Sequence, residues 1–373
     1  MQPADRAAAA PVLLAAGGTG GHLFPAEALA SALARRGIKV HLATDRRAAR
    51  YGGAFADDAI HVISSATLRG RNPIAVGRTA ALLGFGLLQA FALVGRLRPV
   101  AVIGFGGYPT IPPVLAAGWR GVPSLIHDAN AVIGRANRLL APRVSAIATT
   151  FPDVFRNDPA LAGKATLTGN PVRLAVVEAA ATPYPTEPER LRLLVFGGSQ
   201  GARIMAEVVP PAIGLMDASL RARLAIVQQA REEDLLRVRE AYASLSVAAE
   251  VAPFFSDLPA RIAASHLVVS RSGASTVAEL AAIGRPGILV PLPHALDQDQ
   301  FANAGVLERA GGAVRITQDA FTPQRLAAEI AGLAAAPARL QAMAAAAQSI
   351  GRLDAADRLA DLVLKVASRD ATK

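Results

Sequence analysis

Short apolar runs alternate with Ala- and Leu-rich stretches along nearly all of the 373 residues. The runs are continuously apolar rather than alternately apolar and polar, which is typical of strands buried on both faces of a sheet. Such strands, each followed by a helix, build a parallel sheet covered by helices on both sides. The sequence therefore predicts an α/β protein, and its length allows two domains at roughly 150 residues per domain.

The predicted strands fall into two groups separated by a proline-containing polar stretch at 178–190, which is expected to be a surface linker. The first group is 11–16, 39–43, 100–104, 124–127 and 146–149. The second group is 191–196, 223–228, 267–270 and 287–291. Helices are expected over 26–36, 78–96, 113–120 and 356–367.

A glycine-rich loop follows the first strand of each group, with GGTGGH at 17–22 and GGSQG at 197–201. A third segment, SRSGAST at 270–276, opens a helix in a similar way. A strand that turns through glycines into a helix presents backbone N–H groups and the positive end of the helix dipole, which together bind phosphate. The dinucleotide fingerprint GxGxxG fails at Leu23, and no Walker lysine follows either loop. The pattern predicts two Rossmann-like, phosphate-binding domains, although for any single loop a purely structural turn remains the alternative.

Three histidines occupy positions where a catalytic group could lie. His22 stands at the start of a predicted helix, where the dipole disfavours imidazolium and leaves a neutral base. His127 ends an apolar strand and is followed by Asp128 and Asn130, at the sheet edge where α/β proteins bind ligands. His294 has a similar position in the second half, whereas His41 and His61 are expected to be ordinary strand or edge residues. Asp297-Gln298-Asp299 spells a DxD triplet, but metal binding is not the favoured interpretation of so short a pattern.

Charge and composition limit the partners. The chain has 39 Lys and Arg against 29 Asp and Glu, a net charge of +10 that would suit nucleic acid, an anionic bilayer or an acidic small molecule. Aromatic residues make up only 5%, and no basic nucleic-acid motif is present, so nucleic acid is not expected. Cysteine is absent, which excludes disulfides, thiolate metal sites and a cysteine nucleophile.

Two apolar segments are candidates for targeting or membrane insertion. Residues 7–16 carry Asp5 before them and Pro11 within them, which favours a buried strand over a secretory signal. The run at 79–95 contains Gln89 and is shorter than the roughly 20 apolar residues that a spanning helix needs. It is expected to form a buried or interfacial helix in a cytoplasmic protein.

Five motifs in order carry a family resemblance: GGTGGH at 17–22, GFGGYPT at 104–110, GNPVR at 169–173, GGSQGAR at 197–203 and SRSGASTVAE at 270–279. Together they resemble the MurG family of peptidoglycan N-acetylglucosaminyltransferases, a part of glycosyltransferase family 28. The resemblance implies a GT-B fold, in which two Rossmann-like domains with parallel sheets face a central cleft. Residues 1–173 would bind the acceptor lipid I and face the membrane, and residues 174–351 would bind UDP-N-acetylglucosamine (UDP-GlcNAc). The last helix, about 352–373, would cross back onto the first domain.

The resemblance also implies functional residues. Those implied to bind UDP-GlcNAc are Thr19, Gly20, Gly21, Asn130, Arg173, Ser199, Phe255, Ala274, Ser275, Thr276, Val277, Ala278, Glu279 and Gln300. Arg173 and Ser199 would contact the diphosphate, and the Phe255 backbone would contact the uracil. Glu279 would accept hydrogen bonds from the ribose, and Gln300 would bind sugar hydroxyls.

For the reaction, the resemblance implies that GlcNAc moves with inversion to the C4 hydroxyl of MurNAc in lipid I, giving lipid II and UDP. His22 is the expected general base, with Asp128 and His127 as orienting groups or alternative bases. No metal or other cofactor is expected, because helix N-termini and Arg173 can stabilise the leaving UDP. One departure concerns the segment at 127–130, where this chain has His-Asp-Ala-Asn and the family usually has His-Glu-x-Asn.

The implied acceptor is anchored in a bilayer, so the resemblance implies peripheral attachment to the cytoplasmic face of the inner membrane. Anionic phospholipids and other proteins of cell-wall synthesis and division would then be partners. Apolar residues rimmed by arginines would form the attachment patch: Leu82, Leu83, Phe85, Leu87, Leu88 and Trp119, with Arg69, Arg71, Arg78, Arg96, Arg135 and Arg138. Core packing of the helix at 79–95 remains an alternative, as do a UDP-sugar epimerase and a non-catalytic nucleotide-sugar-binding module for the chain as a whole.

Overall fold

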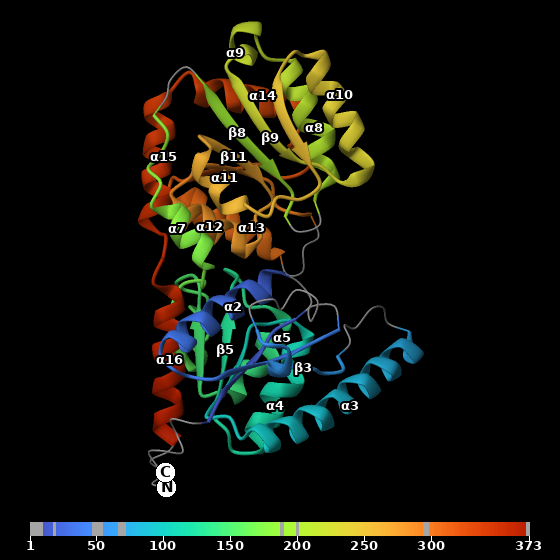
Figure 1. Cartoon of the computed structure of the whole chain (residues 1–373), viewed down its shortest axis with the longest axis vertical. Helices are drawn as coiled ribbons and strands as arrows, with labels where there is room; N and C mark the ends of the chain where they lie inside the picture. Colours follow the sequence, from blue (N-terminus) through green and yellow to red (C-terminus); the bar gives the residue numbers. More distant parts are fainter. Residues whose placement is uncertain are drawn as a thin grey trace. The chain divides into compact units, whose positions relative to one another are not determined.

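The computed structural model describes residues 10–17, 20–46, 55–65, 72–186, 190–198, 201–293 and 298–370. The chain divides into two compact units. Unit 1 comprises Met1–Arg173 together with Leu353–Lys373, and unit 2 comprises Leu174–Arg352. Each unit contains one parallel sheet with helices on both faces (Figure 1). The predicted α/β class with two Rossmann-like domains is therefore confirmed.

The sheet of unit 1 has seven strands in the order β3-β2-β1-β4-β5-β6-β7. Their bounds are β1 Val12–Ala15, β2 Val40–Thr44, β3 Ile60–Val62, β4 Ala101–Gly104, β5 Ser124–Asp128, β6 Ala146–Thr149 and β7 Ala165–Leu167. Strand β1 is central, because Val12 pairs with Val40 on one side and with Ala101 on the other. All four residues of β1 are buried, which explains its continuous apolarity.

Helices cover both faces of this sheet. On one face, α2 (Gly20–Arg35) and α16 (Ala355–Asp370) pack against each other and bury Leu29, Leu33 and Leu359. On the other face lie α3 (Pro73–Leu97), α4 (Ile111–Trp119) and α5 (Arg135–Leu140). The short helix α6 (Pro159–Ala162) precedes β7. Because α16 is the last helix of the chain, its packing on α2 places the C-terminal segment in unit 1 (Figure 1).

The sheet of unit 2 has six strands in the order β10-β9-β8-β11-β12-β13. Their bounds are β8 Leu191–Phe196, β9 Leu224–Gln229, β10 Ala248–Ala252, β11 Leu267–Ser270, β12 Gly287–Leu289 and β13 Ala313–Arg315. Helices α8 (Arg203–Gly214), α10 (Leu235–Ser244) and α14 (Pro323–Ala334) share one core with this sheet. Helices α7 (Leu174–Ala180), α11 (Leu258–Ala264) and α12 (Ala274–Ile283) pack together elsewhere in the unit. The remaining helices are α9 (Ala218–Ala222), α13 (Asp299–Arg309) and α15 (Pro337–Ser349).

The nine predicted strands are all present, with ends that differ by at most two residues. The sequence missed β3, β7, β10 and β13, which are the edge strands of the two sheets. Helix α2 was predicted to begin at residue 26 but begins at Gly20, so the end of the first glycine loop forms its first turn. Within the described part of the chain, no single helix is both long and apolar enough to cross a bilayer, and the one pair of helices that reaches that length together, α14 and α15, is bent by 97°.

Candidate functional site

The strand order of each unit reverses at one point, and both glycine loops leave the sheet there. In unit 1 the chain proceeds outward from β1 to β2 and β3, and then returns to the other side of β1 with β4. Unit 2 repeats this arrangement around β8, between β9 and β11. Open α/β sheets bind ligands at this switch point, beyond the carboxyl ends of the strands. The loops after β1, β4, β8 and β11 are therefore the candidate site elements of the two units.

In unit 1 the loop after β4 is built around glycines. Gly106 and Gly107 have φ angles of 93° and 74°, in the region that favours glycine. The Thr110 hydroxyl donates to the Gly106 carbonyl at 2.6 Å and fixes the turn. A Cβ on Gly106 would lie 3.2 Å from Cε1 of His22, and a Cβ on Gly107 would lie 3.4 Å from its Cδ2. The two glycines thus let the His22 ring lie directly against the loop.

His22 stands in the first turn of α2 and is partly exposed. Its Nδ1 is buried and has no hydrogen-bond partner among the described residues. Burial lowers the pKa of His22 from its ordinary value, and an interaction with the Phe105 backbone acts in the opposite direction. Burial therefore favours the neutral imidazole, which is the form that can accept a proton.

His127 lies at the end of β5 and is fully buried. Its Nε2 is 3.1 Å from the Gly169 carbonyl, and its ring centroid is 5.6 Å from that of Phe105. Burial lowers the pKa of His127 to about 4; the Gly169 carbonyl opposes this effect and the neighbouring His22 adds to it. A ring with no exposed surface cannot reach a substrate hydroxyl, so the geometry favours a supporting role for His127 over that of a base.

The Asp128 carboxylate organises the loop that follows β5. It is buried and accepts three hydrogen bonds of 3.0 Å, from the backbone N–H groups of Asn130 and Gly134 and from Nδ2 of Asn137. The same Asn137 amide also donates to the His127 carbonyl at 3.0 Å. These bonds tie residues 127–137 together and fix the backbone of Asn130, so Asp128 is better suited to positioning than to proton transfer. Asn137 was not among the residues predicted from the sequence. The only sign of it there is a polar residue in the helix that follows the His-Asp-Ala-Asn segment.

Arg173 is the last residue of unit 1 and ends the GNPVR motif. Its guanidinium carbon lies 4.0 Å from the centroid of the Phe24 ring, on α2. It also lies close enough to the Glu27 carboxylate to oppose the rise in the Glu27 pKa that burial causes. Gly20 and Gly21, also predicted to bind the donor, lie in the first turn of the same helix, and Thr19 lies outside the described residues.

In unit 2 the loop after β8 also depends on glycine. A Cβ on Gly197 would lie 2.1 Å from the backbone nitrogen of Ala202, so no other residue fits there without movement. Gly198 and Gly201 have φ angles of 89° and 67°. The Gly197 N–H donates to Oε1 of Gln229 at 3.0 Å, which fixes the loop to the end of β9. Ser199, the predicted diphosphate contact of this loop, lies outside the described residues.

The segment from β11 into α12 holds six of the fourteen predicted donor-binding residues. Gly273 caps α12, whose first residues are Ala274, Ser275 and Thr276, followed by Val277, Ala278 and Glu279. The Ser275 hydroxyl is buried and has no partner among the described residues, and Glu279 is buried one turn further along.

Two further predicted residues border this segment. The Gln300 carbonyl, on α13, accepts from the Ser272 hydroxyl at 2.8 Å, which brings Gln300 beside the helix start. The Gln300 side chain is held by a hydrogen bond from the Leu292 N–H at 3.0 Å. The Phe255 side chain is buried, with the Arg261 guanidinium 4.2 Å from its ring centroid. Its side chain is thus occupied within the unit, which is compatible with the predicted backbone contact.

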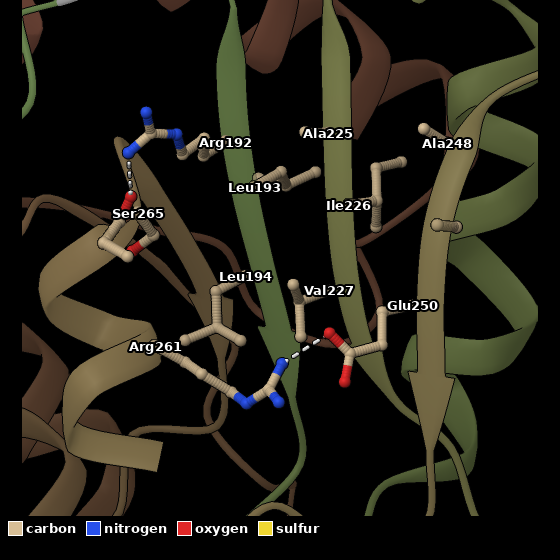
Figure 2. A pocket seen from close by; sticks show the side chains of 12 residues that line it. Arg192, Leu193, Leu194, Ala225, Ile226, Val227, Ala248, Glu250, Arg261 and Ser265 are labelled. Carbon is tan, nitrogen blue, oxygen red and sulfur yellow. Dashed lines mark hydrogen bonds and ion pairs between the residues drawn. The ribbon is translucent and has the colours of Figure 1, made fainter. Parts of the chain in front are cut away.

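A cavity of about 500 Å³ in unit 2 lies away from these loops. It lies against the first halves of β8, β9 and β10 and beside α11, with Leu194 and Val227 on its floor and Arg192, Glu250 and Arg261 on its walls (Figure 2). None of the predicted site residues lines it. The glycine loop of β8 leaves the opposite, carboxyl end of that strand and does not line this cavity.

The structure describes only part of the DxD triplet, for which metal binding was not the favoured interpretation. Asp299 begins α13, and its carboxylate accepts from the N–H of Gln300 at 2.7 Å, while Asp297 and His294 lie outside the described residues. Within the described residues, no three His, Asp or Glu side chains lie together as metal ligands would. His41 and His61 lie on β2 and the edge strand β3, as expected, with ring nitrogens 3.0 Å apart.

Two family models match the chain, the N-terminal domain of glycosyltransferase family 28 over residues 12–149 and the C-terminal domain of that family over residues 192–359. A protein of Rhodopseudomonas palustris strain BisB18 is 64% identical over 358 residues, which are 95% of this chain and 96% of that protein. The chain belongs to glycosyltransferase family 28. The relative is named UDP-N-acetylglucosamine–N-acetylmuramyl-(pentapeptide) pyrophosphoryl-undecaprenol N-acetylglucosamine transferase, as is a Bradyrhizobium (strain ORS 278) protein with 64% identity over 95% of this chain and 98% of that protein.

Solved structures place this family 28 chain among GT-B proteins. The crystal structure of Acinetobacter baumannii MurG has a TM-score of 0.78 and 29% identity, covering 95% of this chain and 99% of that one. UDP-GlcNAc 2-epimerase from Neisseria meningitidis has a TM-score of 0.67 at only 14% identity, covering 95% of this chain and all of that one, which shows a shared fold and nothing more. The resemblance inferred from the five motifs is thereby confirmed.

Proposed function

We propose that this protein is an inverting glycosyltransferase that moves GlcNAc from UDP-GlcNAc to the C4 hydroxyl of MurNAc in lipid I, giving lipid II and UDP. The observation that carries this proposal is the 64% identity, over 95% of the chain, to relatives named for that transfer. The epimerases share the fold at 14% identity, so they do not support a competing activity.

His22 is the general base in this proposal. Of the three candidates, His127 and Asp128 are buried and engaged within unit 1, whereas His22 is partly exposed and has a lowered pKa. It would remove the proton from the acceptor hydroxyl as the oxygen attacks the anomeric carbon and the bond to UDP breaks. A single displacement of this kind inverts the α-linked donor to a β-linked product.

The donor binds the α12 segment of unit 2. The N-terminus of α12 and the buried Ser275 hydroxyl face the diphosphate, and Glu279 holds the ribose hydroxyls, while Gln300 contacts the sugar. From unit 1, Arg173 contacts the diphosphate, and Thr19, Gly20, Gly21 and Asn130 contact the donor. Positive groups at these points stabilise the charge that develops on the leaving UDP, and the proposal requires no metal.

The protein attaches to the membrane through α3 and α4 in this proposal. The buried residues that the structure describes on α3 lie along one side of the helix, and the other side carries Phe85 and Leu88, which are 56% and 69% exposed. Trp119, at the end of the adjacent α4, is 65% exposed. Arg96 and Arg120 supply positive charge beside these residues, and the Arg120 guanidinium carbon lies 3.8 Å from the Phe91 ring centroid. Large exposed apolar residues with arginines at their margin are typical of surfaces that bind anionic bilayers.

The structure describes only some of the remaining arginines of the predicted patch. Arg135 and Arg138 lie on α5, Arg69 and Arg71 lie outside the described residues, and the Arg78 side chain is not described. Vesicle sedimentation tests the patch. We expect Phe85→Ser/Leu88→Ser to lose binding to vesicles containing phosphatidylglycerol while retaining UDP binding. Leu236→Ser, which alters an exposed leucine of unit 2, is the matched control.

Release of UDP tests the chemistry. UDP-GlcNAc is incubated with and without a soluble lipid I analogue, each with and without a chelator, and released UDP is measured. Release that requires the acceptor and survives chelation is expected. Absence of release, with the donor bound and the analogue shown to be competent with a known enzyme, would overturn the proposal. His22→Ala should keep donor binding and lose most turnover, and loss of both would make His22 structural.

A further inference from the structure

Phe24 was not predicted to bind the donor, but it contacts two residues that were, Gly20 and Arg173. Its ring lies on the exposed side of the first turns of α2, against the end of the glycine loop. A Cβ on Gly20 would lie 3.1 Å from Cε2 and 3.2 Å from Cζ of this ring. On the other side, the Arg173 guanidinium carbon lies 4.0 Å from the ring centroid. The aromatic ring thus connects residue 20 with residue 173.

Arg173 contacts the face of the Phe24 ring through the positive charge of its guanidinium group. In a cation–π arrangement the guanidinium is attracted to the ring as a charge above its face, at distances within about 6 Å of the centroid. The N–H donors of a guanidinium lie in its own plane and form the fork that matches phosphate oxygens. The contact with the face of Phe24 therefore attracts the charge of Arg173 and restricts the rotation of a long side chain.

Glu27 adds an electrostatic contact from the same helix. It follows Phe24 by three residues on α2, so the two side chains lie on neighbouring positions of the helix surface. Glu27 is only partly exposed, and burial raises its pKa, while the charge of Arg173 acts in the opposite direction. The carboxylate thus lies close enough to attract the guanidinium toward α2.

We infer that Phe24 is a positioning residue for the nucleoside diphosphate, because its ring holds the Arg173 guanidinium in the orientation in which it binds the diphosphate, with the charge of Glu27 acting beside it. The inference deepens the proposed function and rests on its assignment of Arg173 to the diphosphate. Pre-organising a flexible arginine lowers the entropy lost when the ligand binds, and the effect appears in affinity. The nucleoside portion of the ligand does not depend on this contact.

The experiment compares UDP with uridine, which lacks the phosphates. The dissociation constants of both ligands are measured by calorimetry and competition, first for the unaltered full chain and then for five variants. The variants are Phe24→Leu, Phe24→Tyr, Glu27→Gln, Arg173→Ala and the double variant Phe24→Leu/Arg173→Ala. Phe24→Leu is expected to weaken the affinity for UDP about 5- to 10-fold, which is the range of a partly desolvated cation–π contact. The affinity for uridine should not change. Phe24→Tyr, which keeps the aromatic face, is expected to bind UDP like the unaltered protein. Glu27→Gln is expected to weaken UDP by a smaller factor and to leave uridine unchanged.

The double variant shows whether Phe24 acts through Arg173. Once Arg173 is alanine, adding Phe24→Leu should weaken UDP no further. The inference is overturned if Phe24→Leu weakens UDP and uridine equally, or if its full effect persists without Arg173. If Arg173→Ala binds UDP as tightly as the unaltered protein, the diphosphate contact itself is wrong, while acceptor-dependent UDP release by the unaltered protein still reports independently on the transferase activity. Thermal unfolding of Phe24→Tyr and Glu27→Gln, which keep the side-chain volume, guards against a folding defect.

Discussion

Replacing Asp128 by asparagine separates a positioning role from a role in proton transfer. The buried carboxylate accepts hydrogen bonds from the N–H groups of Asn130 and Gly134 and from Nδ2 of Asn137, each at 3.0 Å. Asparagine has almost the same shape but only one acceptor oxygen, and its amide nitrogen is itself a donor. Whichever way the amide turns, at least one of these three donors must face another donor. We therefore expect Asp128→Asn to loosen the segment 129–134.

The size of this effect follows from the bonds that change. A hydrogen bond to a charged group contributes about 1.5–3 kcal/mol and a neutral one about 0.5–1.5 kcal/mol. Asp128→Asn loses one charged bond outright and weakens the other two, so we expect a loss of about 3–5 kcal/mol in the free energy of unfolding of unit 1. At about 2–4 °C per kcal/mol for a domain of about 200 residues, the unfolding temperature should fall by roughly 6–20 °C.

Denaturant unfolding and turnover are measured on the same samples, with Asp153→Asn, an exposed aspartate of unit 1, as the matched control. If Asp128 positions the loop, Asp128→Asn loses stability, and turnover falls because Asn130 is displaced. An asparagine variant with unchanged stability and abolished turnover would refute this reasoning and make Asp128 the base. Asp128→Glu, which restores the residue usual in the family, should retain turnover if the loop can accommodate one more methylene.

Three further predictions concern buried groups. Because His127 titrates at about 4 in the folded protein and at about 6.5 when unfolded, its contribution to stability is present above pH 6.5 and is lost as the pH falls to 4, by about 3 kcal/mol in total; His127→Asn should flatten this part of a pH–stability curve. The fully buried Arg285 donates to the carbonyls of Ala263, Thr182, Pro183, Ile283 and Gly284, so Arg285→Met should leave these acceptors unsatisfied and destabilise unit 2 by at least about 3 kcal/mol in denaturant unfolding. A Cβ on Gly104 would lie 2.0 Å from Cγ2 of Thr110, so Gly104→Ala should cost about 1–3 kcal/mol and Gly104→Ala/Thr110→Ser should recover most of it by removing that methyl group.

The interior strands could be predicted and the edge strands could not, for one physical reason. An interior strand is covered by helices on both faces, and so most of its residues are apolar, as in Val12–Ala15. An edge strand has a neighbour on one side only and is partly exposed, so its apolar run is short or interrupted. The edge strands Ile60–Val62 and Ala248–Ala252 illustrate this, since the first contains His61 and the second Glu250. Their pairing is set by the neighbouring strand rather than by their own composition.

The glycine loops were predictable because their chemistry is local. The residues that make each glycine turn are adjacent in sequence, so GGTGGH or GGSQGAR identifies both the turn and the helix that follows it. The role of Asp128 was not predictable in the same way. A carboxylate at the end of a strand has the same sequence signature whether it faces a substrate or the backbone of its own loop, and only the three donors around it distinguish the two.

Contacts between distant segments leave no local pattern. Phe24 and Arg173 are 149 positions apart, and nothing in the sequence around either residue predicts their contact. In the parallel sheet, β1 and β7 end at the same edge, although three strands separate them. The segment after β7 returns along that edge, where Gly169 contacts Thr149 and His127, and then reaches Arg173. Topology therefore supplies what the motifs omit. A motif predicts which residue contacts a ligand, whereas the fold determines which neighbouring side chain holds that residue in position.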